Sequence, residues 1–189
     1  TLDFDVVFSN QWPVVHSILT APVLRRRFVQ DWAEIWTKKI FYLELLLSKL
    51  VDYHVTVSGF SRQRLHKYLG VPENKIILIP NGVNYGMFFE GKKEWGRIIY
   101  VGRFVRHKRI DLILRSFLHA QKAIGSLELV LVGDGPLYPY FKRKFGSRDD
   151  IKFLGRVSEK KKLDLLAKSW LFIFTSEREG YGIAVLEAM

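Results

Sequence analysis

Short apolar runs with the character of β-strands alternate along this chain with helical patterns, and this alternation constrains the fold more than any other feature. Residues 98–101 and 128–132 are almost uninterrupted apolar runs, which are typical of strands buried on both faces. Helical patterns follow at residues 109–124, 136–144 and 158–168. Because strands joined by helices run parallel in one sheet, the sequence predicts an α/β fold with Rossmann-like parallel sheets.

The same alternation extends over the rest of the chain. Further strands are expected at residues 5–8, 25–29, 55–57, 75–79, 151–154 and 170–174, and further helices at residues 32–51, 61–69 and 182–189. Capping residues mark several helix ends. Asp31 and Ser61 are expected to cap the helices that start beside them, Gly70 to close the second of these, and Ser158 to cap the helix that runs to Lys168.

Two domains are expected on either side of a polar, glycine-containing stretch at residues 84–96, which has the composition of a linker. Residues 1–83 would form the C-terminal part of a first domain, and residues 97–189 a second domain. The chain begins without Met and ends inside a helical pattern. We therefore expect both ends to be cuts in a longer protein and the second domain to be truncated at its end.

Composition excludes several classes of protein. Hydrophobic residues make up 48% of the chain, too many for a disordered protein. Without cysteine the chain can form neither a disulfide nor a cysteine-ligated metal site. Its longest apolar runs fall far short of the roughly 20 residues of a spanning helix, and its acidic start does not resemble a signal peptide.

Positive charge is concentrated in the second part of the chain. In residues 1–57 the Lys and Arg residues are balanced by Asp and Glu, so the net charge of +11 lies in residues 58–189. Such a charge suits nucleic acid, an anionic membrane or a phosphorylated ligand, or is simply a solvated basic surface. The expected helix at residues 32–51 mixes aromatic and basic residues. It suits a membrane surface, although we favour an ordinary amphipathic helix that covers a sheet.

A glycine-rich turn between the last strand and the last helix carries two carboxylates. Glu179 stands in the turn beside Gly180 and Gly182, and Glu187 follows eight positions later on the helix. Glycines let the backbone approach a ligand closely, and the N–H groups at a helix start attract an anion. A carboxylate beside an anion site suits a ligand that also carries hydroxyls, as a nucleotide sugar does. Glu187 could instead be an exposed helix glutamate.

Three other strand-to-helix loops are expected at the same edge of the sheet, because parallel strands end on one side. In the first, Gly102 precedes Arg103 and Lys108, whose guanidinium fork and point charge both suit phosphate oxygens. The other two loops are tight turns that would bring backbone close to a ligand: Gly133, Asp134 and Gly135 in one, and Gly155, Arg156 and Val157 in the other. The four loops together predict a ligand site at this edge.

These motifs resemble the donor domain of the retaining GT-B glycosyltransferases of family 4, the glycosyl transferases group 1. The most specific match is the Glu179–Glu187 spacing with its flanking glycines. The other matching segments are residues 57–58, 79–83, 100–104 with Lys108, 131–136 and 153–155. The resemblance covers roughly residues 51–189, whereas residues 1–50 resemble the tail of the family's acceptor domain more loosely.

The resemblance implies that a hexose is transferred from a nucleotide-diphosphate sugar to a glycan or lipid-linked acceptor with retention of configuration. Arg103 and Lys108 would hold the diphosphate and stabilise the departing nucleotide in place of a metal ion. Glu179 would bind hydroxyls of the donor sugar, and Glu187 those of the ribose. The remaining donor contacts would come from Gly180, Tyr181 and Gly182 at the phosphates and sugar, and from Arg156 and Val157 at the base.

No metal, no further cofactor and no nucleic-acid partner are expected, and the location is expected to be cytoplasmic, including the cytoplasmic face of an anionic membrane. The chain departs from the family pattern at Asn84, where Asp is usual, and at Glu177 and Arg178, where small or apolar residues are commoner. The family's glycine-rich first loop is absent. One alternative is therefore a non-catalytic nucleotide-sugar-binding relative. Another, which we favour least, is a basic nucleic-acid-binding domain.

Overall fold

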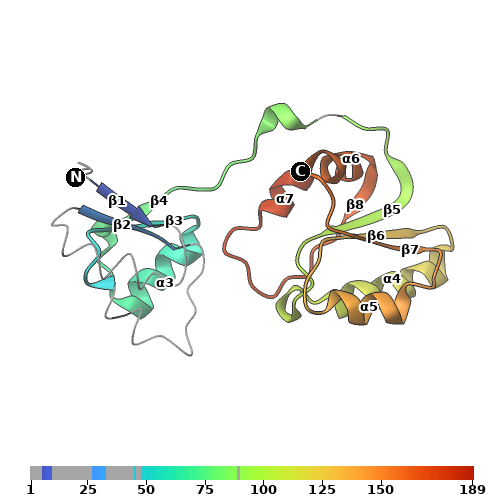
Figure 1. Cartoon of the computed structure of the whole chain (residues 1–189), viewed down its shortest axis with the longest axis horizontal. Helices are drawn as coiled ribbons and strands as arrows, with labels where there is room; N and C mark the ends of the chain where they lie inside the picture. The colour runs from blue at the N-terminus through green and yellow to red at the C-terminus, as the bar shows by residue number, and fades with distance from the viewer. Residues whose placement is uncertain (1–5, 10–26, 33–44, 46–47, 89) are drawn as a thin grey trace. The chain divides into compact units, whose positions relative to one another are not determined.

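The computed structural model describes residues 6–9, 27–32, 45, 48–88 and 90–189. The chain divides into two compact units, Thr1–Asn81 and Gly82–Met189, and each contains its own parallel sheet (Figure 1). Inside the stretch predicted as a linker, the structure has a short 3₁₀ helix, η2 (Tyr85–Met87), and the start of strand β5 at Glu94. The linker and domain bounds stay predictions.

Among the residues that the structure describes, the sheet of the first unit contains four parallel strands in the order β1-β2-β3-β4. They are β1 (Val6–Ser9), β2 (Arg27–Trp32), β3 (Tyr53–Thr56) and β4 (Ile76–Leu78). The prediction that Asp31 caps a helix starting at Trp32 is wrong. Asp31 pairs with Val55 and Trp32 with Thr56, because the ladder with β3 carries β2 past the local capping signal. The predicted helix otherwise lies largely outside the described residues.

Helix α3 (Gly59–Leu69) of the first unit begins and ends at specific caps. Its N-cap is Ser58, whose side chain accepts a hydrogen bond from the Ser61 N–H at 3.1 Å. The prediction that Ser61 is the cap is therefore wrong by one turn, because Ser58 already has the extended backbone that a cap requires. Gly70 closes the helix in the left-handed conformation, with φ of 64°, as predicted.

The sheet of the second unit also contains four parallel strands, in the order β7-β6-β5-β8. They are β5 (Glu94–Val101), β6 (Glu128–Val132), β7 (Ile151–Gly155) and β8 (Ser169–Phe172). The connections contain η3 (Arg106–Lys108), α4 (Ile110–Ile124), α5 (Tyr138–Phe145) and α6 (Glu159–Lys168), and α7 (Ile183–Ala188) follows β8. Ser158 caps α6, as predicted. Across the described part of the chain, no helix combines the length and apolarity needed to cross a bilayer.

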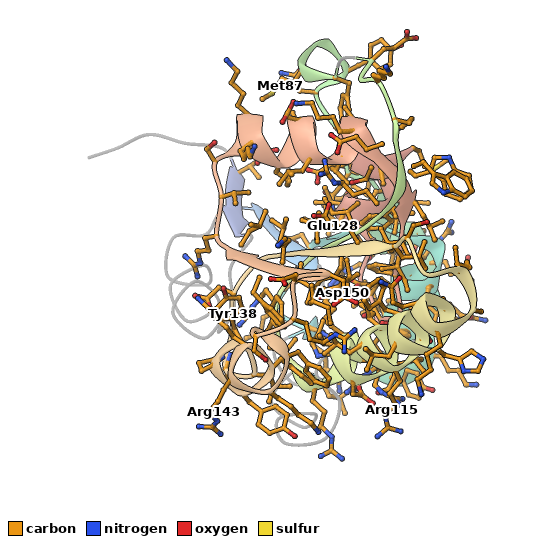
Figure 2. All side chains as sticks on the ribbon, turned by 90° about the vertical axis from the view of Figure 1, so that its right-hand side faces the viewer. Met87, Arg115, Glu128, Tyr138, Arg143 and Asp150 are labelled. Atoms are coloured by element: carbon orange, nitrogen blue, oxygen red, sulfur yellow. The ribbon has the colours of Figure 1, made fainter. Side chains whose placement is uncertain are left out.

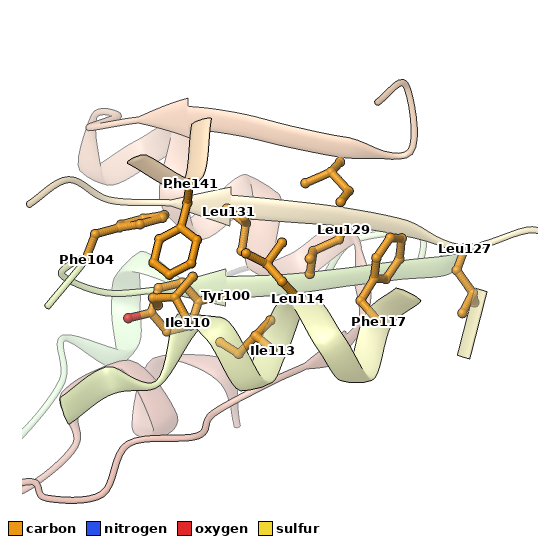
Figure 3. Close-up of a cluster of buried hydrophobic side chains, with 11 residues drawn as sticks. Tyr100, Phe104, Ile110, Ile113, Leu114, Phe117, Leu127, Leu129, Leu131 and Phe141 are labelled. Atoms are coloured by element: carbon orange, nitrogen blue, oxygen red, sulfur yellow. The ribbon is translucent and has the colours of Figure 1, made fainter. Parts of the chain in front are cut away.

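Helices cover both faces of this second sheet (Figure 1). On one face α4 and α5 close a core of large apolar side chains around Tyr100, Phe104 and Phe141 (Figure 3). On the other face Ile99 packs with the apolar side of α6. Tyr100 and Ile99 are neighbours on β5, point to opposite faces and are both fully buried. This double burial explains the near-continuous apolar strands in the sequence.

Strand β5 lies between β6 and β8, and this order fixes the place of a ligand site. From β5 the chain continues to β6 and β7 on one side, and then returns to add β8 on the other side. In open parallel sheets, ligands bind outside the carboxyl ends of the strands where the order reverses. That point lies between the loop that follows Val101 and the loop that follows Phe172.

Candidate active site

The loops after β5 and β8 carry two side chains that meet at this switch point. The ammonium group of Lys108 forms an ion pair with the carboxylate of Glu179. Their side chains are 16% and 24% exposed, so the pair is partly shielded from water. The Lys108 Nζ also lies 5.7 Å from the centre of the Phe174 ring, within range of a cation–π contact. The structure thus brings together two of the three residues predicted as catalytic.

A second ion pair joins the same two loops. Arg109 donates to the carboxylate of Glu177, with 2.7 Å between Nη1 and Oε1, and its Nε lies 3.2 Å from Asp111 Oδ1. Hydrogen bonds from Arg109 to Asp111 and Glu177 raise the pKa of the guanidinium above its ordinary value. The hydrogen bond that Arg109 donates to Asp111 lowers the pKa of the Asp111 carboxyl. Glu177 is visible in the sequence as an unusual charge, but its partner was not predicted.

Backbone contacts hold the β8 loop against the β5 loop. The Glu177 N–H donates to the carbonyl of His107 at 2.8 Å. The Thr175 hydroxyl donates to the carbonyl of Lys108 at 2.9 Å. These bonds hold the residues that precede Glu179 against the backbone at His107 and Lys108.

Arg109 also has an unusual backbone conformation. Its φ is 51°, and it is the one non-glycine residue with positive φ in the described part of the chain. A left-handed conformation costs a side-chain-bearing residue roughly 1–2 kcal/mol. Such conformations persist where surrounding contacts hold them, and they cluster at functional sites. Here the bonds to Asp111 and Glu177 hold Arg109.

The glycines of the predicted loops pack the loops against one another. The Gly102 N–H donates to the carbonyl of Val132 at 3.0 Å, and the Gly133 N–H donates to the carbonyl of Gly155 at 2.8 Å. Gly133 has φ of 124°, and a Cβ there would overlap the carbonyl oxygen of Gly102. The sequence predicted that the backbone of these loops approaches a ligand closely. In the structure these glycines allow the backbone of one loop to approach the backbone of the next. The ligand contacts of Gly102, Gly133 and Gly135 stay predictions.

Arg103, the third predicted catalytic residue, takes no part in the Lys108–Glu179 ion pair. Its side chain is exposed and takes part in no ion pair among the described residues. Its carbonyl accepts a hydrogen bond from the Tyr100 hydroxyl at 3.0 Å. Burial, together with the negative charge of Glu179, raises the pKa of Tyr100, so this hydroxyl stays a donor that fixes the start of the loop.

Arg156, which is predicted to contact the base, is more exposed to solvent than Glu187, which is predicted to contact the ribose. Arg156 is highly exposed and lies 3.9 Å from a carboxylate oxygen of Asp134, while Val157 is half-buried. Glu187 is only 13% exposed and bonds to the ammonium of Lys162 at 2.8 Å. The alternative interpretation of Glu187 as an exposed helix glutamate is therefore wrong, because α6 places Lys162 against it.

Lys162 is a partner that sequence reasoning missed. It also contacts Glu159 at 2.6 Å. Burial alone would lower the pKa of Lys162, but the hydrogen bonds that its ammonium donates to Glu159 and Glu187 raise it overall. The Glu159–Lys162 spacing of three is a local signal on a helix, whereas the contact with Glu187 depends on the packing of α7 on α6. Gly180, Tyr181 and Gly182, which precede α7, are half-buried, and Gly182 has φ of 85°.

A pocket of about 450 Å³ lies beside the second ion pair. Its apolar lining consists of Ile110, Leu137 and Phe141, and its polar lining consists of Arg106, Arg109, Asp111 and Glu177. The two arginines and two carboxylates cancel in charge. Within the described ranges, no three His, Asp or Glu side chains gather in a way that could hold a metal ion.

An open parallel sheet with charged loops at its switch point defines a Rossmann-like nucleotide-binding class of protein. Residues 88–189, more than half of the chain, match the family of glycosyl transferases group 1. Residues 2–87 match the glycosyltransferase family 4. The chain therefore belongs to the glycosyl transferases group 1, as the sequence motifs predicted.

Known relatives agree with this assignment. A phosphatidylinositol N-acetylglucosaminyltransferase subunit of Arabidopsis thaliana is 26% identical over 73% of this chain and 32% of its own length. The O-antigen chain mannosyltransferase RfbU of Salmonella typhimurium is 27% identical over 97% of this chain and 55% of its own. The chain thus spans about a third to about half of these relatives.

Solved structures show the same architecture. The crystal structure of Anabaena Alr3699/HepE in complex with UDP and glucose matches 98% of this chain and 56% of its own, with a TM-score of 0.82 and 17% identity. The crystal structure of TarM matches 97% of this chain and 38% of its own, with a TM-score of 0.80 and 15% identity. The predicted GT-B type of α/β fold is confirmed.

Proposed function

We propose that the protein containing this chain is a glycosyltransferase that transfers a hexose from a nucleotide-diphosphate sugar, with retention of configuration, to a glycan or lipid-linked acceptor. The observation that carries the proposal is the Lys108–Glu179 ion pair at the switch point of a family donor-domain fold. The Lys108 ammonium suits a phosphate, and the Glu179 carboxylate suits sugar hydroxyls. A nucleotide sugar presents both groups next to each other.

In the proposed donor complex, the diphosphate replaces Glu179 as the partner of Lys108. Glu179 is then released to accept hydrogen bonds from the sugar hydroxyls. Arg103, exposed in the same loop, would add a bidentate contact to a phosphate oxygen pair. Positive charge held in place at the leaving group stabilises the negative charge that develops on the nucleotide as the glycosidic bond breaks. This arrangement needs no metal ion in the proposed mechanism.

The remaining donor contacts follow the shape of the loops. Glu187, held by Lys162, would accept hydrogen bonds from the ribose hydroxyls, and its low exposure means that its orientation is already fixed. The backbone at Gly180 and Gly182 would approach the phosphates and sugar. The loop at Arg156 would meet the base. The structure of Alr3699/HepE in complex with UDP and glucose supports a UDP-sugar as one candidate donor.

The proposed acceptor class has support from the names of the relatives. One relative is a phosphatidylinositol N-acetylglucosaminyltransferase subunit, and another is an O-antigen chain mannosyltransferase. The first name specifies a lipid and the second a glycan chain, so both kinds of acceptor belong in the proposal. A cytoplasmic location is part of the same proposal, and the lack of cysteine fits it.

Two measurements on the full-length protein that contains this chain test this function. Saturation-transfer NMR against UDP-, GDP- and ADP-sugars should identify one donor, and binding to none of them would contradict the proposal. The anomeric coupling constant of the purified product should match that of the donor, and the opposite anomer would contradict retention. Donor binding without turnover on any glycan or lipid-linked acceptor would instead support the non-catalytic relative.

A further inference from the structure

The outer side of helices α4 and α5 carries more positive charge than its carboxylates neutralise. Helix α4 contains a single acidic residue, Asp111, which bonds to Arg109, and α5 contains none. The exposed basic side chains of these two helices are Arg115, Lys122, Lys142, Arg143 and Lys144. None of them forms an ion pair within the described residues. Figure 2 shows Arg115 and Arg143 on the outer side of this helix layer.

The opposite face of the same sheet has a different arrangement of charge. On α6, Lys161 and Lys168 contact Asp164 at 3.7 and 2.7 Å, and Lys162 contacts Glu159 and Glu187. Of the four lysines on this helix, Lys160 alone forms no ion pair with the described residues. Pairs spaced three or four residues apart, such as these on α6, stabilise the helix and neutralise its charge. The α4–α5 layer, defined by the exposed side chains of these two helices, lacks such pairs. Its charge is therefore available to a partner.

Apolar and aromatic side chains interrupt this basic layer. Tyr140 is 47% exposed, and Lys144 Nζ lies 5.9 Å from its ring centre. Lys142 Nζ lies 5.6 Å from the ring of Tyr138. On α4, Leu112 is 41% exposed. Tyrosine has an apolar ring and a polar hydroxyl, and lysine has an apolar stem that ends in a charge. Surfaces that combine such side chains are typical of helices that lie at the headgroup level of a bilayer.

We propose that the α4–α5 layer binds the surface of a membrane that contains anionic lipids. Its unpaired cations would neutralise lipid headgroups, and Tyr140 and Leu112 would enter the boundary with the acyl chains. An RNA or an acidic polysaccharide would use the cations but would gain nothing from Leu112. The layer binds lipid whether or not the protein transfers sugar.

The position of the α4–α5 layer would leave the loops at the switch point accessible to substrates when the layer is bound to a membrane. Helix α4 begins at Ile110, directly after Lys108 and Arg109. The switch point therefore lies at one end of the helices that would rest on the membrane. Docking on the α4–α5 layer would leave the loops beside the lipid surface and uncovered by it, where an acceptor anchored in that surface could reach them.

Co-sedimentation of the full chain with vesicles tests the proposal. Vesicles of phosphatidylglycerol and phosphatidylcholine should bind the chain, and pure phosphatidylcholine should bind it much more weakly. The triple variant Lys142→Gln, Arg143→Gln and Lys144→Gln should lower the affinity for anionic vesicles about a hundredfold, given the attraction of each basic residue for an anionic surface. Tyr140→Ala should lower it further, by roughly fivefold.

The chain provides a matched control on the other face of the sheet. The triple variant Lys160→Gln, Lys161→Gln and Lys168→Gln on α6 removes the same charge and should change the affinity by less than about threefold. Equal losses in the two variants would overturn the proposal, because net charge alone would then explain the binding. Failure to bind anionic vesicles, or binding to RNA but not to vesicles, would also overturn it. Unchanged nucleotide-sugar affinity in both variants shows that they are folded.

Discussion

Arg109 in the loop after β5 and Glu177 in the loop after β8 are 68 positions apart in the chain and form an ion pair of 2.7 Å. The pair lies directly beside Lys108 and Glu179, which form the other ion pair between these loops. Both contacts therefore connect one loop to the other. We infer that the Arg109–Glu177 pair positions the loop that carries Glu179.

Replacing Arg109 by Ala should weaken donor binding more than it weakens the fold. The side chains of Arg109 and Glu177 are 37% and 51% exposed, and exposed pairs contribute only about 0–1 kcal/mol to stability. Donor affinity should fall roughly tenfold, because a displaced Glu179 loop would lose the preorganised donor contacts that we propose for it. Isothermal titration with the donor and urea unfolding measure the two effects separately.

Arg148→Ala is the matched control for this experiment. Arg148 forms a 2.7 Å ion pair with Asp150, at the beginning of β7 and away from the carboxyl ends of the strands. It should alter stability by a similar amount and leave donor affinity unchanged. Equal losses of donor affinity in both variants would show that Arg109 has no positioning role.

Glu179→Gln should have opposite effects on a nucleotide and on its sugar. In the free protein Glu179 forms an ion pair with Lys108, so a diphosphate that binds Lys108 as proposed would first displace this carboxylate. Removing that negative charge should tighten binding of a nucleoside diphosphate about three- to tenfold, while turnover should fall at least a hundredfold because the sugar hydroxyls lose a charged acceptor. Titration calorimetry and a turnover assay measure the two effects.

Lys108→Gln completes the comparison. It should weaken binding of the nucleoside diphosphate, because it removes the cation that the phosphates would contact. Weaker nucleoside diphosphate binding in Glu179→Gln would argue against competition between the carboxylate and the phosphates. Unchanged turnover in Glu179→Gln would remove its proposed role at the donor sugar.

Gly133→Ala should destabilise the second unit severely. Gly133 has φ of 124°, and a Cβ there would meet backbone of Gly102, which cannot move without disturbing β5. We expect a loss of about 3 kcal/mol or more from the combined overlap and backbone strain. Gly125→Ala is the matched control, because Gly125 also has positive φ, of 82°, but has open space around it. Its expected loss is about 1 kcal/mol, from strain alone, and equal losses in chemical denaturation would contradict the predicted overlap.

Local sequence patterns predicted the strands of this chain more accurately than they predicted its helix caps and side-chain contacts. The apolar runs at residues 98–101 and 128–132 gave correct strands, because burial on both faces leaves a signal in the sequence itself. The cap at Ser58 instead of Ser61 was missed, since both serines carry the same local signal and the backbone decides between them. The strand at Asp31 was missed because a sheet partner outweighs a capping residue.

Distant ion pairs could not be predicted in the same way. The Glu179–Glu187 spacing and the basic loop at Lys108 identified the edge of the sheet where the site lies. The partners of those residues depend on how β8 and α7 pack, which adjacent residues do not determine. Lys162 is 25 positions from Glu187, and Lys108 is 71 from Glu179. The charged residues were therefore predictable from the sequence, but which of them pair in the free protein was not.

Acid should destabilise the first unit through His54 of β3. His54 is buried, with 1% of its surface exposed. Burial, with the nearby positive charge of Lys75, lowers its pKa from 6.5 to about 4. The unfolded chain therefore takes up a proton on His54 as pH falls below 6.5, while the folded unit does not until pH nears 4. Stability from the neutral His54 is thus fully present above pH 6.5 and is lost as pH falls toward 4, by about 3 kcal/mol in all.

Hydrogen exchange of the β3 and β4 amides between pH 4 and 7, corrected for the intrinsic exchange rate, measures this loss locally. His54→Leu should reduce the pH dependence of their protection, because the buried titrating group is gone, whatever the variant does to stability at pH 7. His119→Leu, which removes an exposed histidine on α4, is the control and should leave that dependence intact. An unaltered pH dependence in His54→Leu would mean that another group makes the first unit sensitive to acid.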